Sequence, residues 1–211
     1  MENKVYVIAM AHDIPEADYR NYVSPMKTRR YSRLLKRALV TALKCMQDSG
    51  IAQPDAIING TALGSLEESE HILDGLVTEG EAVSMPTQFT LCTHNAVASL
   101  IGIYTHNVGY NNTFSQGSVS FESAMLDAFL QLKSGSIRHA LVCANDDLTD
   151  RMKQKMQESG LTIGRHLNRS IAVMLSSEPG ERPLYEITNV TIAHQPGGED
   201  TGHIEYVKLC D

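Results

Sequence analysis

Two hydrophobic periods alternate along this chain, one typical of buried strands and one typical of helices. Short apolar runs predict strands at residues 5–10, 55–59, 110–115, 140–144, 170–176 and 185–193. Apolar residues spaced three and four apart predict helices at residues 32–49, 96–104 and 121–132, and the acidic segment 67–75 favours another short helix. Gly50 and Gly135 follow two of these helices at the position where helices commonly end.

This alternation predicts an α/β fold. Strands joined by helical crossovers form a mostly parallel central sheet with helices on both faces. We expect the 32–49 helix on one face and the 121–132 helix, which is apolar on more than one side, packed against the sheet and mostly buried. No linker or repeat divides residues 1–211, which we interpret as one domain. Residues 196–211 are polar and without a clear period, so they are expected to form a weakly structured tail.

The carboxyl ends of the predicted strands are where a ligand is expected, since open α/β sheets bind ligands at that edge. Four short segments follow these strands: Ala11-His12-Asp13, Gly60-Thr61, Gln116-Gly117-Ser118 and Asn145-Asp146-Asp147. The acidic residues among them could hold a cation, or they could be a solvated loop of the kind common at strand ends.

Composition excludes several function classes. Eighteen basic against 25 acidic residues give a formal charge of -7, which argues against a nucleic-acid-binding surface. The apolar run from Val5 to Ala11 is far shorter than the ~20 residues of a membrane helix. With no signal-like N-terminus, we expect a cytoplasmic protein with reduced thiols.

Metal and cofactor sites are not predicted either. The four cysteines and eight histidines lack ligand spacing. Their closest group, Cys92-Thr93-His94, offers two ligands where zinc needs three or four. That pair could be a displaced thiol–imidazole pair, although packing and capping roles fit two residues so placed better.

Four segments, taken in order, resemble the β-ketoacyl synthases. Arg30 to Gly50 is similar to their first long helix, with a basic start, an Ala-rich middle and an Asp-x-Gly ending. Asn59 to Glu67 resembles their Gly-Thr-x-x-Gly-Gly-x-Glu segment, with a serine in place of the second glycine. Asn95 to Gly109 resembles the helix and turn before their nucleophile, and Lys133 to Ala144 the helix end and strand after it. The resemblance implies the N-terminal, thiolase-like half-fold of these enzymes.

The same resemblance aligns Ser118 with the acyl-accepting cysteine of the family, without a gap on either side. The family pattern is Ala-Cys-x-Ser-Gly, whereas this chain has Gly117-Ser118-Val119-Ser120-Phe121. Gln116 lies two residues earlier, and chain-length factors, the inactive partners of polyketide ketosynthases, carry glutamine in place of the cysteine. The resemblance therefore implies that Gln116, Gly117, Ser120 and Phe121 surround an acyl- or partner-binding position.

Two functions follow from a serine at this position. A serine hydroxyl needs an adjacent general base, and the family's catalytic histidines and lysine belong to a C-terminal half that residues 1–211 do not match. The first function is a non-catalytic partner or chain-length-type subunit in fatty-acid, aryl-polyene or polyketide-like synthesis, in which Ser118 is a small residue or helix cap. The second is an acyltransferase or thioesterase with Ser118 as its nucleophile, completed by a separate C-terminal half.

The resemblance also implies the partners. These are an acyl carrier protein and a full-length ketosynthase. The basic residues Arg29, Arg30, Arg33, Lys36 and Arg37 are either a docking patch for the acidic carrier protein or a solvated helix face. In the family the strand before the nucleophile pairs with its counterpart across a two-fold axis. Here that strand is 110–115, so we expect a homodimer or heterodimer through it.

Overall fold

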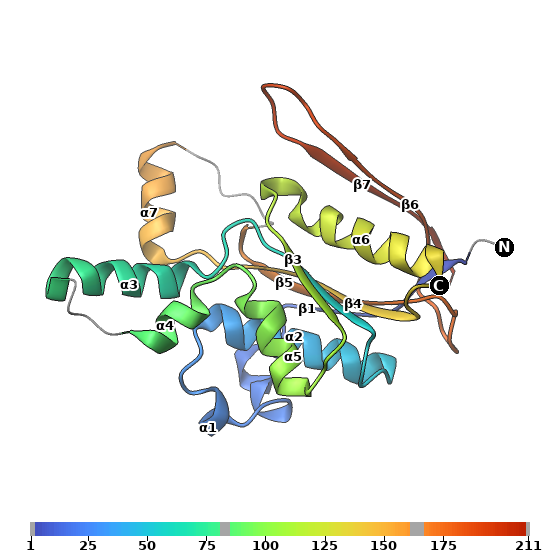
Figure 1. Cartoon of the computed structure of the whole chain (residues 1–211), viewed down its shortest axis with the longest axis horizontal. Helices are drawn as coiled ribbons and strands as arrows, with labels where there is room; N and C mark the ends of the chain where they lie inside the picture. Colours follow the sequence, from blue (N-terminus) through green and yellow to red (C-terminus); the bar gives the residue numbers. More distant parts are fainter. Residues whose placement is uncertain (1–2, 81–84, 161–166, 210–211) are drawn as a thin grey trace.

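Strands and helices alternate in the computed structural model, which describes residues 3–80, 85–160 and 167–209 (Figure 1). The strands are β1 (Val5–His12), β2 (Ala56–Gly60), β3 (Tyr110–Phe114), β4 (His139–Asp146), β5 (Arg169–Ser176), β6 (Tyr185–Ala193) and β7 (Thr201–Lys208). The α-helices are α1 (Pro25–Thr28), α2 (Arg33–Ser49), α3 (Leu66–Glu79), α4 (Pro86–Leu91), α5 (Ala96–Thr105), α6 (Ser120–Ser134) and α7 (Asp150–Glu158). Two 3-10 turns, η1 (Glu16–Asn21) and η3 (Gly117–Val119), complete the order.

The seven strands form one mixed sheet in the order β3-β2-β4-β5-β1-β6-β7. β2 runs parallel to both β3 and β4, whereas β5 is antiparallel to both β4 and β1. The first four strands therefore point the same way and β5 points against them. This arrangement confirms the predicted α/β class with a mostly parallel centre. β6 and β7 extend the sheet as antiparallel strands.

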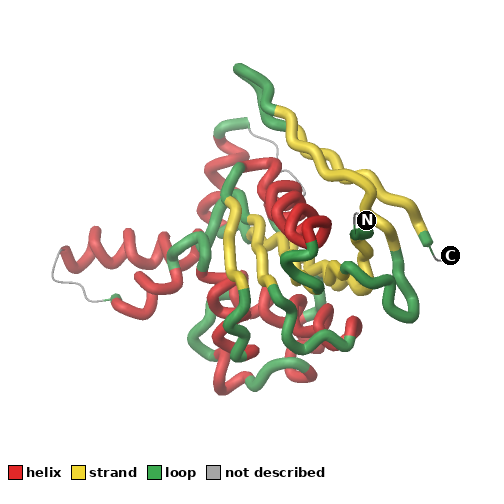
Figure 2. Tube along the Cα trace, turned by 45° about the vertical axis from the view of Figure 1, so that its right-hand side comes forward, coloured by secondary structure: helices red, strands yellow, loops and turns green. Residues whose placement is uncertain are grey.

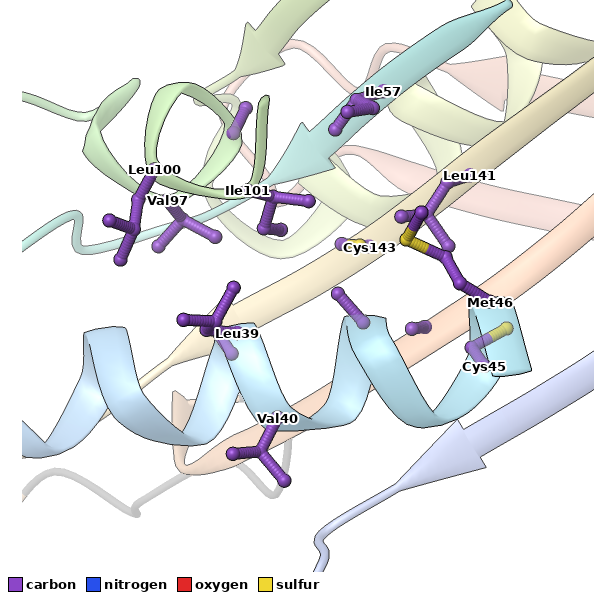
Figure 3. Close-up of a cluster of buried hydrophobic side chains, with 14 of the residues drawn as sticks. Leu39, Val40, Cys45, Met46, Ile57, Val97, Leu100, Ile101, Leu141 and Cys143 are labelled. Carbon is purple, nitrogen blue, oxygen red and sulfur yellow. The ribbon is translucent and has the colours of Figure 1, made fainter. Parts of the chain in front are cut away.

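One face of the sheet is covered by α2 and α5. The apolar stripe of α2 includes Leu35 and Leu39, which are fully buried, and Gly50 ends the helix in the left-handed conformation. Figure 3 shows Leu39 of α2 and Ile101 of α5 facing each other over the strands, with Cys143 of β4 beside them. These contacts make the larger of the two hydrophobic cores described here.

The opposite face is covered by α6 and by the β6–β7 hairpin. Ala124, Ala128 and Leu132 of α6 are buried against the sheet, as its helical period predicts. Figure 2 shows the two strands of the hairpin leaving the sheet and running beside α6. They approach the helix so closely that a Cβ on Gly202 of β7 would clash with the side chain of Glu122.

Residues 196–211 were expected to be a weakly structured tail, but Thr201–Lys208 forms β7. The prediction was wrong because only alternate residues in the first half of this strand are partly buried, which gives a weak apolar pattern. The strand is held by backbone pairing with β6, which the apolar pattern alone does not reveal. No helix in the described ranges is long and apolar enough to cross a bilayer.

Candidate functional site

The candidate site is the turn that joins β3 to α6. β3 ends at Phe114, whose carbonyl accepts a hydrogen bond from the N–H of Thr61 at 3.0 Å. The chain then turns through Gly117, which has a φ of 56°, and enters α6. Gly60 at the end of β2 lies so close to this turn that a Cβ there would stand 2.5 Å from the carbonyl oxygen of Ser120. The end of β2 therefore fixes the start of α6.

Ser120 ties this turn to the sheet. It is buried, and its Oγ accepts a hydrogen bond from the N–H of Gln116 at 2.9 Å. The same hydroxyl lies 3.1 Å from the carbonyl oxygen of Thr61 and 2.8 Å from that of Gly117. The side chain of Gln116 turns back onto α6, where its Oε1 accepts a hydrogen bond from Ser123. Both residues thus hold the shape of the turn.

Ser118 is exposed in this turn, and the partner of its hydroxyl is a backbone carbonyl, not a basic side chain. Its Oγ donates to the carbonyl oxygen of Asp200 at 3.2 Å. Asp200 and His194 lie in the loop between β6 and β7, and the Nδ1 of His194 is 2.7 Å from the carboxylate of Asp200. The imidazole is 76% exposed, and no contact between it and Ser118 occurs among the described residues. Among the described residues, the Ser118 hydroxyl therefore has a backbone carbonyl and no basic side chain as its hydrogen-bond partner.

The loop contact was missed by sequence reasoning. Ser118 and Asp200 are 82 residues apart, so no local pattern joins them. The Pro196-Gly197-Gly198 sequence between two possible strand segments is the one signal that could have indicated a hairpin here.

Phe121 points away from the exposed side of the turn. It is half-buried, and the guanidinium carbon of Arg169 lies 5.8 Å from the centre of its ring. Of the five residues expected at the site, Gln116, Gly117, Ser118 and Ser120 share one turn, whereas Phe121 faces the second core.

The thiols lie elsewhere. Cys143 and Cys45 are buried in the first core, and burial raises the pKa of the Cys45 thiol to about 12 and that of Cys143 further still. Cys92 caps α4, where its Sγ donates to the carbonyl oxygen of Phe89, while the ring of His94 lies over Gly64. Cys92 and His94 thus have different neighbours. Among the described residues, no group of three or more potential ligands could hold a metal ion.

A second polar region lies at the carboxyl ends of β2 and β4. The buried carboxylate of Asp146 accepts hydrogen bonds from Thr61 Oγ1 at 2.7 Å and from the N–H groups of Ala62 and Leu63 at 2.9 to 3.0 Å. Asp147 binds the guanidinium of Arg33 through two hydrogen bonds, which raise the pKa of that arginine. Of the predicted strand-end residues, Thr61, Asp146 and Asp147 thus lie at one edge of the sheet and bind groups of the chain itself.

A polar cavity of about 280 Å³ lies beside this region, between the N-termini of α2, α3 and α7. Its charged groups are already paired. Lys153 binds Asp150 at 2.9 Å, and Glu67 accepts a hydrogen bond from the N–H of Arg33 at 3.2 Å. The contact between Glu67 and Arg33 joins α3 to α2, and a hydrogen bond from Thr149 Oγ1 to Glu70 at 2.7 Å joins the start of α7 to α3.

The comparisons with known proteins bear on this architecture. The model of the β-ketoacyl synthase N-terminal domain matches residues 7–205. The chain belongs to this family. A comparison with curated proteins gave no match.

Solved structures of ketosynthases share the fold. A chain in the complex of a ketosynthase with its chain length factor from Xenorhabdus doucetiae is 18% identical, with a TM-score of 0.65 over 91% of this chain and 84% of that chain. A β-ketoacyl synthase from Burkholderia phymatum STM815 is 12% identical, with a TM-score of 0.72 over 92% and 64%. A chain in the complex of a type II PKS acyl-carrier protein with its ketosynthase is 14% identical, with a TM-score of 0.80 over 93% of this chain and 70% of that chain. These likenesses confirm the thiolase-like fold of this ketosynthase family member.

Proposed function

We propose that this chain is a non-catalytic subunit that pairs with a full-length ketosynthase in fatty-acid, aryl-polyene or polyketide-like synthesis in the cytoplasm. The observation that carries the proposal is the hydrogen bond from Ser118 Oγ to the carbonyl oxygen of Asp200. A carbonyl cannot take the proton of a serine, so the hydroxyl at the family's nucleophile position has no route to an alkoxide. Such a subunit contributes surface and shape instead of a covalent step.

The partner surface in this proposal is the free edge of β3. β3 lies at one end of the sheet, and among the described residues it pairs with β2 alone. Its five residues carry no charge, and apolar side chains are exposed beside it, with Ile103 73% and Val108 99% exposed. An uncharged strand edge flanked by apolar surface favours association with another strand. The alternative occupant of this edge is a second copy of the chain.

An acyl carrier protein is the second proposed partner. Between Tyr19 and Gln47 lie eight of the 18 basic residues and none of the 25 acidic ones, which leaves ten basic and 25 acidic residues elsewhere. Arg33 and Arg37 have internal partners, since Asp147 binds the first and Asn168 the second. The exposed cations of this segment that lack a partner among the described residues are Arg20, Lys27, Arg29 and Arg30. They suit an acidic protein surface.

Two measurements test the proposal. A pull-down from the native cell should recover a full-length ketosynthase. Intact-mass measurement after incubation with an acyl thioester should show no covalent adduct. Failure to recover a synthase, together with an acyl adduct that Ser118→Ala removes, would overturn the proposal.

One observation favours the alternative enzyme, an acyltransferase or thioesterase. The His194–Asp200 pair has the 2.7 Å separation of a histidine oriented by a carboxylate, and it lies in the loop that contacts Ser118. Hydrolysis of an acyl thioester that is lost in both Ser118→Ala and His194→Ala would assign this activity. Loss in neither variant would exclude it.

A further inference from the structure

β7 forms the end of the sheet that lies opposite to β3, and its outer edge is free. Among the described residues β7 pairs with β6 alone. Figure 2 shows the β6–β7 hairpin extending away from the rest of the sheet. The strand runs from Thr201 to Lys208, and Tyr206 and Val207 are 62% and 52% exposed. A strand of this length with one unpaired side favours association, because its outward N–H and C=O groups can extend the ladder.

The backbone groups of β7 that face outward belong to every second residue. The N–H of Leu209 donates to the carbonyl oxygen of Leu184, on the β6 side, at 3.0 Å. Directions alternate along an antiparallel strand, and the register shift of this pair lies in β6, so β7 keeps its alternation. The N–H groups of Gly202, Ile204 and Tyr206 therefore face the free edge. They have no partner from another element in the described part of the chain.

These directions restrict how two copies of β7 can pair. In an antiparallel pair about a two-fold axis, an outward-facing residue of one strand must lie opposite an outward-facing residue of the other. The two registers with the longest overlap pair residues 201–207 or residues 202–208 of both copies. The second register places Glu205 opposite Glu205 of the partner subunit, and like charges directly opposite each other are destabilising.

The first register instead places His203 of each copy opposite Glu205 of the partner subunit. Both side chains are exposed, and they lie on the face of the hairpin away from α6, because Ile204 between them packs into the second core. Residues paired in this way have Cα atoms ~4.5 Å apart, and an imidazole N–H can donate to a carboxylate at that spacing. Charge complementarity thus favours one register, and the occupant is a second copy of the chain.

We propose that β7 pairs with β7 of a second copy in this register, so that two seven-stranded sheets join into one. The inference does not depend on the proposed function, which uses β3 at the other end of the sheet. Both edges can be occupied together, with a ketosynthase at β3 and a second copy of the chain at β7.

Sedimentation of the Thr113→Pro variant at micromolar concentration tests this interface, because a proline there removes association through β3. We expect a dimer. Glu205→Lys should weaken dimerisation about tenfold, since it replaces an attractive contact by a repulsive one in both copies. Adding His203→Glu to this variant restores opposite charges across the axis and should restore the dimer. Glu178→Lys, in the exposed loop between β5 and β6, makes the same charge change and should leave the dimer intact.

Hydrogen exchange reports the pairing directly. The N–H groups of Gly202, Ile204 and Tyr206 should gain protection as the chain concentration rises, whereas those of His203 and Glu205, which face β6, should be protected at every concentration. A monomer, a dimer that Glu205→Lys leaves intact, or a double variant that stays monomeric would overturn the proposal. Ketosynthase capture by the unmodified chain, measured in parallel, reports separately on the proposed function.

Discussion

At the residue scale, the proposed inactivity of Ser118 rests on a single hydrogen bond. Its hydroxyl is aligned with the family nucleophile, exposed, and placed where the chain enters α6. Its proton nevertheless points to a backbone carbonyl. Nucleophilic serine requires an acceptor that gains basicity from its surroundings, which is a property of imidazole and not of an amide carbonyl. In the proposed function, Ser118 therefore keeps the position of the nucleophile but lacks the base that would make it reactive.

Glu68 is a residue whose burial predicts a pH-dependent stability. It is 5% exposed, and burial, reinforced by the negative charge of Glu67, raises its carboxyl pKa above the usual 4.5. A raised folded-state pKa means that ionisation opposes folding, so this cost grows as the pH rises above the unfolded pKa and is absent below it. Glu68→Gln should therefore increase the free energy of unfolding at pH 7, with no gain at pH 4.

The neighbouring residue provides the control for this measurement. The carboxylate of Glu67 accepts a hydrogen bond from the first N–H of α2. Glu67→Gln should lower stability by about 0.5 kcal/mol, because it removes a negative charge at a helix N-terminus. Urea denaturation of both variants at the two pH values checks the signs. A gain from Glu67→Gln, or a gain from Glu68→Gln that persists at pH 4, would contradict this account.

His106 ends α5 in a left-handed conformation, with φ 54° and ψ 34°. A side chain with a Cβ is strained there by about 1 kcal/mol, and glycine is not. His106→Gly should raise the free energy of unfolding by about 0.5 to 1 kcal/mol, since the exposed imidazole makes no hydrogen bond in the described residues. His106→Ala keeps the Cβ and should bring no gain. Chemical denaturation distinguishes them, and equal effects of the two variants would refute the strain.

At the level of elements, the proposed association of the chain depends on the free edge of β3. The N–H of Tyr110 donates to Asp55, on the β2 side. Because successive amides of a strand alternate in direction, the N–H of Thr113 faces away from β2, and it bonds the side chain of Asn112. This amide can be removed without breaking the β2–β3 ladder.

Thr113→Pro should therefore abolish association through β3 while the sheet remains folded. Sedimentation at micromolar concentration reports the homodimer, and ketosynthase capture reports the heterodimer. Thr113→Val keeps the amide and should behave as the unmodified chain. A clean monomer that captures no synthase with or without the proline would remove this edge as the interface.

The elements that the sequence predicted are those that carry their own apolar period. The 121–132 helix differs from α6 by one residue at its start and two at its end, because its buried positions recur every three to four residues. By contrast, α7 has only two methionines on an otherwise polar segment. Its first turn is capped by Thr149, and Arg151 pairs with Asp74, 77 residues away. Such partners are invisible to a local pattern.

The same limit applies to the site. Order and spacing were sufficient to place Ser118 between β3 and α6 and to expect Gln116 beside it. They could not show that the loop after β6 supplies the acceptor for Ser118, because hairpin geometry sets that contact. They also could not show that Arg33 and Arg37 of the basic cluster are used internally.

For the whole molecule, charge is divided unevenly along the chain. A net charge of -7 conceals one basic segment, residues 19–47, in an otherwise acidic protein. This division makes long-range attraction to an acidic partner sensitive to the side from which it approaches. The folded chain should therefore orient an acidic carrier protein toward η1, α1 and the start of α2.

Replacement of Arg29 and Arg30 by glutamate should weaken acyl carrier protein binding about tenfold, mainly through slower association. Binding to the unmodified chain should also fall as salt rises from 50 to 500 mM, because the groups are exposed and screened. Arg182→Glu, outside the basic segment, is the matched control. Surface plasmon resonance measures the rates. Equal loss in the control, or no salt dependence, would reject this orientation.

The position of β1 between β5 and β6 has a consequence for how the chain folds during synthesis. β3, β2 and β4 come from residues 56–146 and can pair as soon as that stretch has left the ribosome. β1 is made first, yet its two neighbours begin at Arg169 and Tyr185. Closing a loop of this length is entropically slow, and an unpaired apolar strand is prone to aggregate while it waits. The N-terminal strand is therefore the segment most in need of a chaperone until translation has nearly ended.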